Sequence, residues 1–551
     1  MAHPASACKP PHATTIRSIP DDSCPGTWSP GARTIFSTPD LPTVTLDATL
    51  ADLYRRASPK NAHKHIAQVT CPVNSAVQLS VNIPRNTKYL YQDSAFNEVE
   101  REDGPNASSA ESERELAMKY IALVPQRDAF ISGDTAVVLF TVDESQEQKV
   151  HCRREAETTF SVLPEKQRPN LVFCLGPAEL PVKEKRIDLI VCKLVHDGLE
   201  GYDLLVPPET LWLINTKEAL ANSGLPTPRC DIIEVDGCGG EAHLCCAVCQ
   251  GEADSFLIPV KCAGLRGKWF TKQSLKIYRE LSAHSLPFVF KNQQAYGGAG
   301  TYLIRTEADR EKLLRDLQGG ILRRLLSSIT HANKHLRPAT ILLSDLVDDP
   351  IGNYGLSFFV TDDDSELIFL AVTEQILHEG RIWLGSTIEY SRQDELRRKF
   401  GKLVKDMASW LRSYNYVGPV GVDVLETAAT VENSRMEQFK HGPADELANF
   451  HVVDLNARTS GQLCLPLLRT HFTSRGLDSA SSFFIRVWKK REAFVRAFQE
   501  DFEAGRICIL SWYEDLESDM SLGNVAVGAE DLNRLKEDMQ RIRGVSEEVT
   551  F

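Results

Sequence analysis

The sequence predicts a protein of mixed α/β and α+β class that is built from several folding units. At roughly 100–200 residues per domain, its 551 residues correspond to about three to five units. Apolar residues make up 42% of the chain and charged residues 25%, which are ordinary globular proportions. Runs of β-branched residues alternate with stretches of helical periodicity, and this mixture is typical of the predicted class.

The first 130 residues carry the weakest pattern. Residues 1–40 are rich in Pro, Ser and Thr and are predicted to form a disordered tail. Residues 41–130 hold short apolar runs without a clear period and then, from Ser94, a polar stretch punctuated by Gly and Pro. We interpret them as an N-terminal extension followed by a polar linker.

Residues 131–225 are predicted to form an α/β domain. Three β-branched runs, which begin at Thr135, Asn170 and Arg186, are typical of buried strands of a parallel sheet. A single helix is expected from Pro208 to Gly224, because a glycine followed by prolines commonly ends a helix.

Helices and strands are also expected to alternate through the remainder of the chain. Thr306 and Asp309 form a plausible capping box at a helix start. One long amphipathic helix is predicted from apolar residues at helical spacing, namely Leu396, Phe400, Leu403, Met407 and Leu411. The stretch 529–543 is expected to be an exposed helix. The polar stretch from about Thr427 to Ala448 is predicted to be a surface hairpin.

The charge of the chain disfavours several classes of partner. Acidic residues outnumber basic ones, 75 against 62, and the formal net charge is −13. This sign disfavours binding to nucleic acid or to an anionic membrane. We find neither a run of about 20 apolar residues that could cross a membrane nor a secretory signal. We therefore expect a cytoplasmic protein in which most of the 14 cysteines are reduced.

A glycine-rich segment follows a predicted strand that ends in Lys291. It comprises Gly297, Gly298, Ala299, Gly300 and Thr301. Small residues let successive backbone N–H groups face an anion, and a nearby lysine adds a positive charge for phosphates. Because the lysine precedes the glycines, the segment is neither a Walker A loop nor a kinase loop. A plain hairpin turn is the alternative. Lys217, further upstream, is a second candidate, with a solvated lysine as its alternative.

Polar side chains alternate along two later strands. Asp423 lies in one apolar strand, and Asp454, Asn456 and Arg458 occupy every second position of the next, so that they share one face. The other face carries Val453, Leu455 and Ala457, which are expected to pack on the core. Carboxylate and amide oxygens suit Mg²⁺, and an arginine can hold a phosphoryl group. A structural Arg–Asp ion pair is the alternative.

A cysteine cluster lies between residues 238 and 262. It comprises Cys238, His243, Cys245, Cys246, Cys249 and Cys262. A structural zinc site at Cys238, Cys246, Cys249 and Cys262 is one interpretation. A redox or disulfide pair is a second interpretation, and simple buried or free thiols are the third.

These motifs, in this order, resemble the ATP-grasp superfamily, and in particular the fungal solid-state culture-specific ATP-grasp proteins. More distantly, the chain is similar to bacterial amino-acid and peptide ligases. The segments that carry the resemblance are INTKEALANSGLPTP, PFVFKNQQAYGGAGT, ILLSDLV, YVGPVGVDVLE and VVDLNARTSG, within about residues 130–490. The resemblance implies a pre-ATP-grasp domain (131–225), a small lobe (226–340), a large lobe with the metal site (341–490) and a C-terminal segment (491–551).

The resemblance also implies roles for single residues. Lys217 and Lys291 match the phosphate-binding lysines, and residues 297–301 match the loop that closes over the β- and γ-phosphates. Ser344, Asp345, Leu346 and Val347 match the segment that reads adenine. Asp423, Asp454 and Asn456 match ligands of Mg²⁺, or of Mn²⁺. Arg458 matches a catalytic arginine that contacts the transferred phosphate. Ser344 and Asp454 stand where glutamate is commoner in the family. Glu374 is predicted either to line the substrate pocket or to form a structural ion pair.

The resemblance implies an ATP-dependent ligase of specialised (secondary) metabolism. Such an enzyme joins a carboxylic acid to an amine, or to a thiol, through an acyl phosphate, and releases ADP and phosphate. A non-catalytic nucleotide-binding scaffold and a small-molecule kinase are the alternatives. The identities of the acid and the amine and the oligomeric state are left open.

Overall fold

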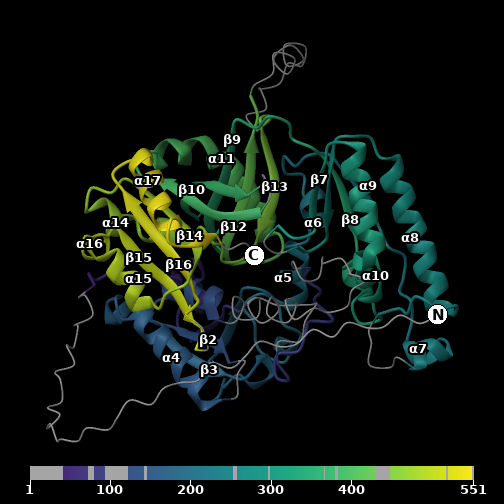
Figure 1. The fold of residues 1–551 in the computed structure, drawn as a ribbon, viewed down its shortest axis with the longest axis horizontal. Coiled ribbons are helices and arrows are strands. Elements are labelled where there is room, and N and C mark those ends of the chain that lie inside the picture. The colour runs from purple at the N-terminus through teal and green to yellow at the C-terminus, as the bar shows by residue number, and fades with distance from the viewer. Residues whose placement is uncertain are drawn as a thin grey trace, which may run out of the picture. The chain divides into compact units, whose positions relative to one another are not determined.

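The computed structural model describes residues 41–71, 80–92, 122–141, 145–251, 257–295, 298–364, 366–378, 382–428, 447–516 and 519–548. All of these lie in one unit, Pro39–Phe551. The predicted tail, most of the predicted linker, most of the predicted surface hairpin after Thr427, and Gly297 lie outside the described residues. Three sheets organise the part of the chain that is described (Figure 1), and they confirm the α/β and α+β class.

A four-stranded parallel sheet has the order β3-β2-β1-β4. Its strands are β1 (Ile66–Val69), β2 (Ala136–Phe140), β3 (Asn170–Cys174) and β4 (Leu189–Cys192). The three β-branched runs therefore form the parallel sheet that the sequence predicts. The sequence does not predict β1, which has only four residues and a central polar residue, Gln68. It comes from the segment that we interpret as an N-terminal extension. The helices of this part of the chain are α1 (Leu50–Ala57), α3 (Val124–Phe130) and α4 (Gln146–Phe160).

The helix expected from Pro208 to Gly224 is in fact two helices, α5 (Pro208–Ile214) and α6 (Lys217–Ala221). Asn215 ends α5, and Thr216 begins α6 by accepting a hydrogen bond from the backbone N–H of Ala219 at 3.1 Å. Ser, Thr and Asn side chains favour such caps because they satisfy backbone groups that a continuous helix would satisfy itself. The break places Lys217 in the first turn of a new helix.

A smaller antiparallel sheet has the order β5-β8-β6-β7. Its strands are β5 (Cys230–Ile233), β8 (Ile341–Asp345), β6 (Phe288–Asn292) and β7 (Thr301–Ile304). Its helices are α7 (Ala247–Gly251), α8 (Leu265–Ala283), α9 (Glu307–Asp316) and α10 (Leu322–Ser327), and Figure 1 shows the last three of these alongside β7 and β8. The predicted capping box of Thr306 and Asp309 is confirmed at the start of α9. Phe288 and Phe290 pack into the apolar core that these helices form.

The largest sheet runs β13-β12-β9-β10-β11-β14-β16-β15, with β17 beside β14. Its strands are β9 (Gly352–Val360), β10 (Leu367–His378), β11 (Ile382–Glu389), β12 (Gly418–Glu426), β13 (Phe450–Asn456), β14 (Ser479–Val487), β15 (Ile507–Glu514), β16 (Ser521–Ala529) and β17 (Glu547–Glu548). The accompanying helices are α11 (Gln393–Arg412), α13 (Cys464–Leu467), α14 (Arg469–Thr473), α15 (Arg491–Ala497), α16 (Gln499–Glu503) and α17 (Leu532–Arg543).

The sequence predicts two helices in this region, and the structure confirms the prediction for one and contradicts it for the other. The apolar stripe of α11 is buried as predicted, and α11 contacts β9 and β10. The expectation of an exposed C-terminal helix is wrong, because α17 buries Leu535, Met539 and Ile542 against β14 and β16. The spacing of these three residues places them on one apolar face of the helix. The charged residues between them make the sequence look uniformly polar. Among the described residues, none of the helices combines the length and apolarity that crossing a membrane requires.

Candidate active site

Two carboxylates face each other on the hairpin of β12 and β13. Asp423 and Asp454 are direct partners in the register of the two strands. The register shifts just after this pair, so that Val424 is the partner of Val452 and Val453 is left without one. Such a bulge turns a backbone group out of the ladder. The Val453 carbonyl accepts a hydrogen bond from Lys291 Nζ at 2.9 Å. The bulge also places Val453 in the cavity lining, where the sequence predicts a core residue.

Two lysines approach the carboxylates from other elements. Lys217, in α6, forms an ion pair with Asp454, and its exposed fraction of 9% rules out the solvated-lysine alternative. Lys291 comes from β6, where Phe288 and Phe290 point into the core, so that the alternate residues Val289 and Lys291 face the cavity. Burial, together with the positive charge of Lys217, lowers the pKa of Lys291 to about 8.

The surroundings make the two carboxylates different. Burial, together with the negative charge of Asp454, raises the pKa of Asp423 to about 7, although Gln375 donates a hydrogen bond to it. Burial alone would raise the pKa of Asp454 as well. The adjacent cations of Lys217, Arg458 and Lys291 outweigh that effect and lower its pKa. Two carboxylates and the nearby amide oxygen of Asn456 form a hard-oxygen donor set, which fits Mg²⁺ or Mn²⁺.

Arg458 is held by the residue that separates α5 from α6. Asn215 is 4% exposed. Its Oδ1 accepts hydrogen bonds from Arg458 Nη1 at 2.8 Å and from the backbone N–H of Ala457 at 2.9 Å. Its Nδ2 donates to the Leu211 carbonyl at 2.7 Å. A buried amide that makes these three hydrogen bonds fixes the direction of the arginine. Sequence reasoning missed Asn215 because the residue falls within what looks like one helix.

The two carboxylates, the two lysines and Arg458 line one cavity of about 290 Å³. All three sheets, or the segments next to them, contribute to this lining. The predicted residues in its lining are Lys217, Lys291, Gly298, Thr301, Ser344, Asp345, Leu346, Val347, Asp423, Asp454, Asn456 and Arg458. The structure thus brings most of the predicted site together. Apolar residues from the small and large sheets, Val289, Leu303 and Leu425, lie in the same lining as the predicted adenine segment 344–347.

The glycine-rich segment connects β6 to β7, so it is a hairpin connection as well as a part of the cavity lining. Lys291 and Thr301 are partners in the β6–β7 register. Gly300 has a φ of +69°, and a Cβ at this position would collide with the side chain of Asn292. Both constraints require glycine at position 300. Ala299 and Gly300 are not part of the cavity lining, whereas Gly298 and Thr301 are.

The prediction that Glu374 lines the pocket is wrong. Glu374 is absent from the cavity lining, and it forms an ion pair with Arg392 at 3.7 Å, as the alternative interpretation has it. Successive residues of a strand point to opposite faces of the sheet. The next residue of β10, Gln375, therefore faces the cavity and donates to Asp423.

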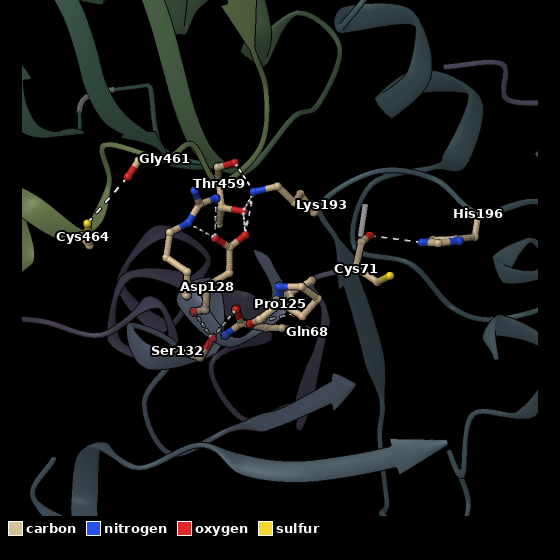
Figure 2. A network of polar contacts seen from close by, with 12 residues as sticks. Gln68, Cys71, Pro125, Asp128, Ser132, Lys193, His196, Thr459, Gly461 and Cys464 are labelled. Atoms are coloured by element: carbon tan, nitrogen blue, oxygen red, sulfur yellow. Dashed lines mark hydrogen bonds and ion pairs between the residues drawn. The ribbon is translucent and has the colours of Figure 1, made fainter. Parts of the chain in front are cut away.

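A buried polar network lies at another part of the cavity, and no sequence motif predicts it. Figure 2 shows Asp128, Lys193 and Thr459 pointing toward one another. Lys193 Nζ donates to Asp128 Oδ2 at 2.7 Å and to the Thr459 carbonyl at 2.8 Å. The Thr459 hydroxyl donates to the same carboxylate oxygen at 2.6 Å. Arg127 pairs with the other oxygen of Asp128 at 3.1 Å.

The carboxylate of Asp128 is shared by the two cations. Burial lowers the pKa of Lys193 to about 8, although Asp128 favours its charged form. Burial by itself raises the pKa of Asp128, but Lys193 and Arg127 lower it below its usual value. Both cations contribute to the cavity lining, next to the aromatic side chains of Trp383 and Phe484. The guanidinium of Arg127 lies 5.4 Å from the centroid of the Phe484 ring.

No protein-family model matches the chain, and a search of curated proteins finds no match. Among solved structures, the chain is similar to N5-carboxyaminoimidazole synthetase from Staphylococcus aureus complexed with ADP. The identity is 12% and the TM-score 0.43, over 87% of this chain and 96% of that chain. It is also similar to carboxyaminoimidazole ribonucleotide synthase from Aspergillus clavatus complexed with ATP (12% identity, TM-score 0.41, 88% of this chain and 98% of that chain). A third similar structure is that of L-amino acid ligase from Bacillus licheniformis. The identity is 10% and the TM-score 0.43, over 88% of this chain and 98% of that chain.

Proposed function

We propose that the chain is an ADP-forming ATP-grasp ligase that joins a carboxylic acid to an amine. One observation carries the proposal. A single cavity collects two lysines for phosphates, two carboxylates and an amide for a divalent cation, and an arginine for the group in transfer. Phosphoryl transfer is catalysed almost entirely by positioning and by charge neutralisation, and this set of residues supplies both.

Each group has a role in the proposed reaction. Lys217 and Lys291 neutralise the phosphates of ATP, and the segment 344–347 with its apolar neighbours holds the base. Mg²⁺ or Mn²⁺, held by Asp423, Asp454 and Asn456, would neutralise phosphate charge when bound. Arg458, which Asn215 orients, stabilises the negative charge on the phosphoryl group as it moves to the acid.

The reaction has two displacements. A carboxylate oxygen of the acid attacks the γ-phosphorus, and ADP leaves. The amine then attacks the acyl carbon, loses a proton and displaces phosphate, so that an amide forms. No side-chain nucleophile takes part. The cations of Arg127 and Lys193, which line the cavity together with Trp383 and Phe484, support a subsite for an acid that has an apolar or aromatic body. A role in specialised metabolism is a proposal that rests on the resemblance alone.

The test is ADP and phosphate release by the purified full chain with Mg²⁺-ATP. A panel of carboxylic acids is offered with and without amines, and the products are identified by mass spectrometry. Release that needs both an acid and an amine, with an amide as product, is the expected result. A stable phosphorylated acid that no amine consumes would make the protein a kinase instead. Failure to bind Mg²⁺-ATP in calorimetry would contradict the ligase and leave a scaffold that does not bind nucleotide.

A further inference from the structure

Four cysteine thiols converge outside the active-site cavity. The cysteine tetrad consists of Cys245, Cys246, Cys249 and Cys262, and its four sulfur atoms all lie within 4.8 Å of one another. Cys262 Sγ lies 3.6 Å from Cys245 Sγ, 3.7 Å from Cys246 Sγ and 3.3 Å from Cys249 Sγ. In a tetrahedral zinc site with Zn–S bonds of about 2.3 Å, neighbouring sulfurs are about 3.8 Å apart. The tetrad is therefore close to the size of a zinc tetrathiolate.

The groups around the tetrad suit negatively charged sulfur. The backbone N–H of Arg266 donates to Cys245 Sγ at 3.5 Å. The side chain of Arg266 is buried next to this contact. Gly264 leaves room for the sulfurs, because a Cβ there would lie 2.5 Å from Cys245 Sγ. Hydrogen-bond donors of this kind are the usual partners of metal-bound ligands.

The segment that carries the tetrad has little else to hold it together. Among the residues that the structure describes from 234 to 265, only Cys249, Ile258 and Pro259 are buried. The apolar side chains of Leu244, Val260 and Leu265 are 70%, 80% and 72% exposed. A segment without an apolar core needs a covalent or metal crosslink to fix its conformation. The segment that carries the tetrad leads directly into α8, and α8 packs on the small sheet that carries Lys291.

We propose that the tetrad is a structural zinc site that fixes the start of α8. The thiols bind as thiolates, so each protonated thiol releases its proton to solvent, and neither zinc nor sulfur changes oxidation state. The structure corrects the ligand set predicted from the sequence, because Cys245 takes the place of Cys238. Cys238 instead packs against the apolar core of the small sheet. A closed set of four protein ligands is the signature of a structural rather than a catalytic zinc site.

The first experiment measures metal content. The full chain is purified under reducing conditions without added zinc, and zinc and iron are counted per chain by mass spectrometry. About one zinc per chain is expected. Cys249→Ser and Cys262→Ser should lose it, whereas Cys238→Ser, the matched control, should keep it. Iron in place of zinc, a disulfide within the tetrad, or loss of zinc in the Cys238→Ser variant would overturn the proposal.

A second measurement covers the case in which the serine variants fail to fold. Zinc is removed from the wild-type chain with a chelator under reducing conditions, and Co²⁺ is added as a probe. The absorption spectrum should show tetrahedral cobalt with thiolate charge-transfer bands, which one equivalent of Zn²⁺ abolishes. The thermal unfolding midpoint should fall on chelation and recover on addition of zinc. Octahedral cobalt, or a midpoint that chelation does not change, would contradict a structural tetrathiolate site.

Discussion

At the scale of single residues, the site depends on positively charged lysines that lie next to negatively charged aspartates. Lys217 pairs with Asp454, and Lys291 donates to the bulged carbonyl of Val453 while its charge interacts with both carboxylates. Opposite charges lower the cost of burying one another, whereas the like-charged pairs Lys217–Lys291 and Asp423–Asp454 raise it, so removing one charge changes the protonation of the others.

Asp454→Ala should abolish ATP turnover in the presence of Mg²⁺. The substitution removes a proposed metal ligand and leaves Lys217 without its partner. We expect turnover to fall by at least about a hundredfold, which is typical for the loss of one group that stabilises transferring charge. ADP release by a coupled assay measures the effect, and circular dichroism checks the fold. Glu374→Gln, which changes a neighbouring carboxylate outside the cavity, should retain turnover. Wild-type turnover by a folded Asp454→Ala variant would refute the metal assignment.

Lys291→Ala should act mainly on ATP binding. A charged hydrogen bond contributes about 1.5–3 kcal/mol, so the dissociation constant of Mg²⁺-ATP should rise roughly ten- to a hundredfold. Isothermal titration calorimetry measures this constant directly. Lys312→Ala, which removes an exposed lysine of α9, is the matched control and should bind ATP as the wild type does. An unchanged constant in the Lys291→Ala variant would show that this lysine does not contact the phosphates.

At the scale of elements, sequence patterns predicted those features that repeat over several turns or strands. The parallel strands β2, β3 and β4 and the stripe of α11 are of this kind. The two carboxylates could be found because Asp423 lies in an apolar strand and Asp454 and Asn456 alternate along β13. Arg458, predicted on the same strand, lies just past its end, where its backbone N–H donates to the Asn456 carbonyl at 2.8 Å. The break at Asn215 and the bulge at Val453 depend on single residues and on contacts with distant segments, so local periodicity does not reveal them. Asp128 and Lys193 were missed for the same reason, because only the fold brings them to Thr459.

One element-scale prediction concerns the β15–β16 hairpin. Arg506, just before β15, and Glu530, just after β16, form a two-armed ion pair, with one arm of 2.9 Å. The hydrogen bonds from Arg506 lower the pKa of Glu530 from 4.5 to about 2. A lowered carboxylate pKa stabilises the fold above the unfolded value and loses this effect as the pH falls toward the folded value. Because the Glu530 side chain is 50% exposed, solvent limits the gain to about 0.5–1 kcal/mol.

Glu530→Gln should therefore be less stable than the wild type at neutral pH, and the difference should shrink as the pH is lowered below about 4.5. Urea unfolding at several pH values measures this difference. Glu311→Gln, which removes an exposed carboxylate of α9, is the control and should show a smaller difference at neutral pH. A difference that grows on acidification would have the wrong sign for this ion pair.

At the scale of the whole described unit, one apolar core joins the parallel sheet to the largest sheet. Its members come from the beginning, the middle and the end of the described chain, and they include Leu50, Phe130, Phe160, Phe359, Leu465 and Leu510. The polar network of Asp128, Lys193 and Thr459 makes a second connection between the same two parts. It fixes the loop after β13, and with it Arg458, relative to the parallel sheet.

Asp128→Ala should destabilise the protein by about 3–5 kcal/mol, because it leaves the buried Lys193 and Arg127 without their shared carboxylate. Chemical denaturation measures the change in the free energy of unfolding. Asp364→Ala, at a site that is 96% exposed, is the matched control and should change stability by less than about 0.5 kcal/mol. The double variant Asp128→Leu/Lys193→Met should recover part of the loss, since it removes both charges together. An Asp128→Ala variant that is as stable as the wild type would show that the network does not help to hold the two parts together.

The β12–β13 hairpin has a practical consequence for protein engineering. Its ladder runs from Gly421 to Glu426 on one strand, and β9 supports the same strand along its other edge. The backbone N–H of Thr427 donates to the Asn449 carbonyl at 2.9 Å, which closes the ladder before residues 429–446 begin. Asp423 and Asp454 thus keep their spacing through the sheet and not through the chain that links them. A circular permutant whose new termini open within 429–446 should preserve both carboxylates, and the same position offers a place to attach a fluorescent reporter.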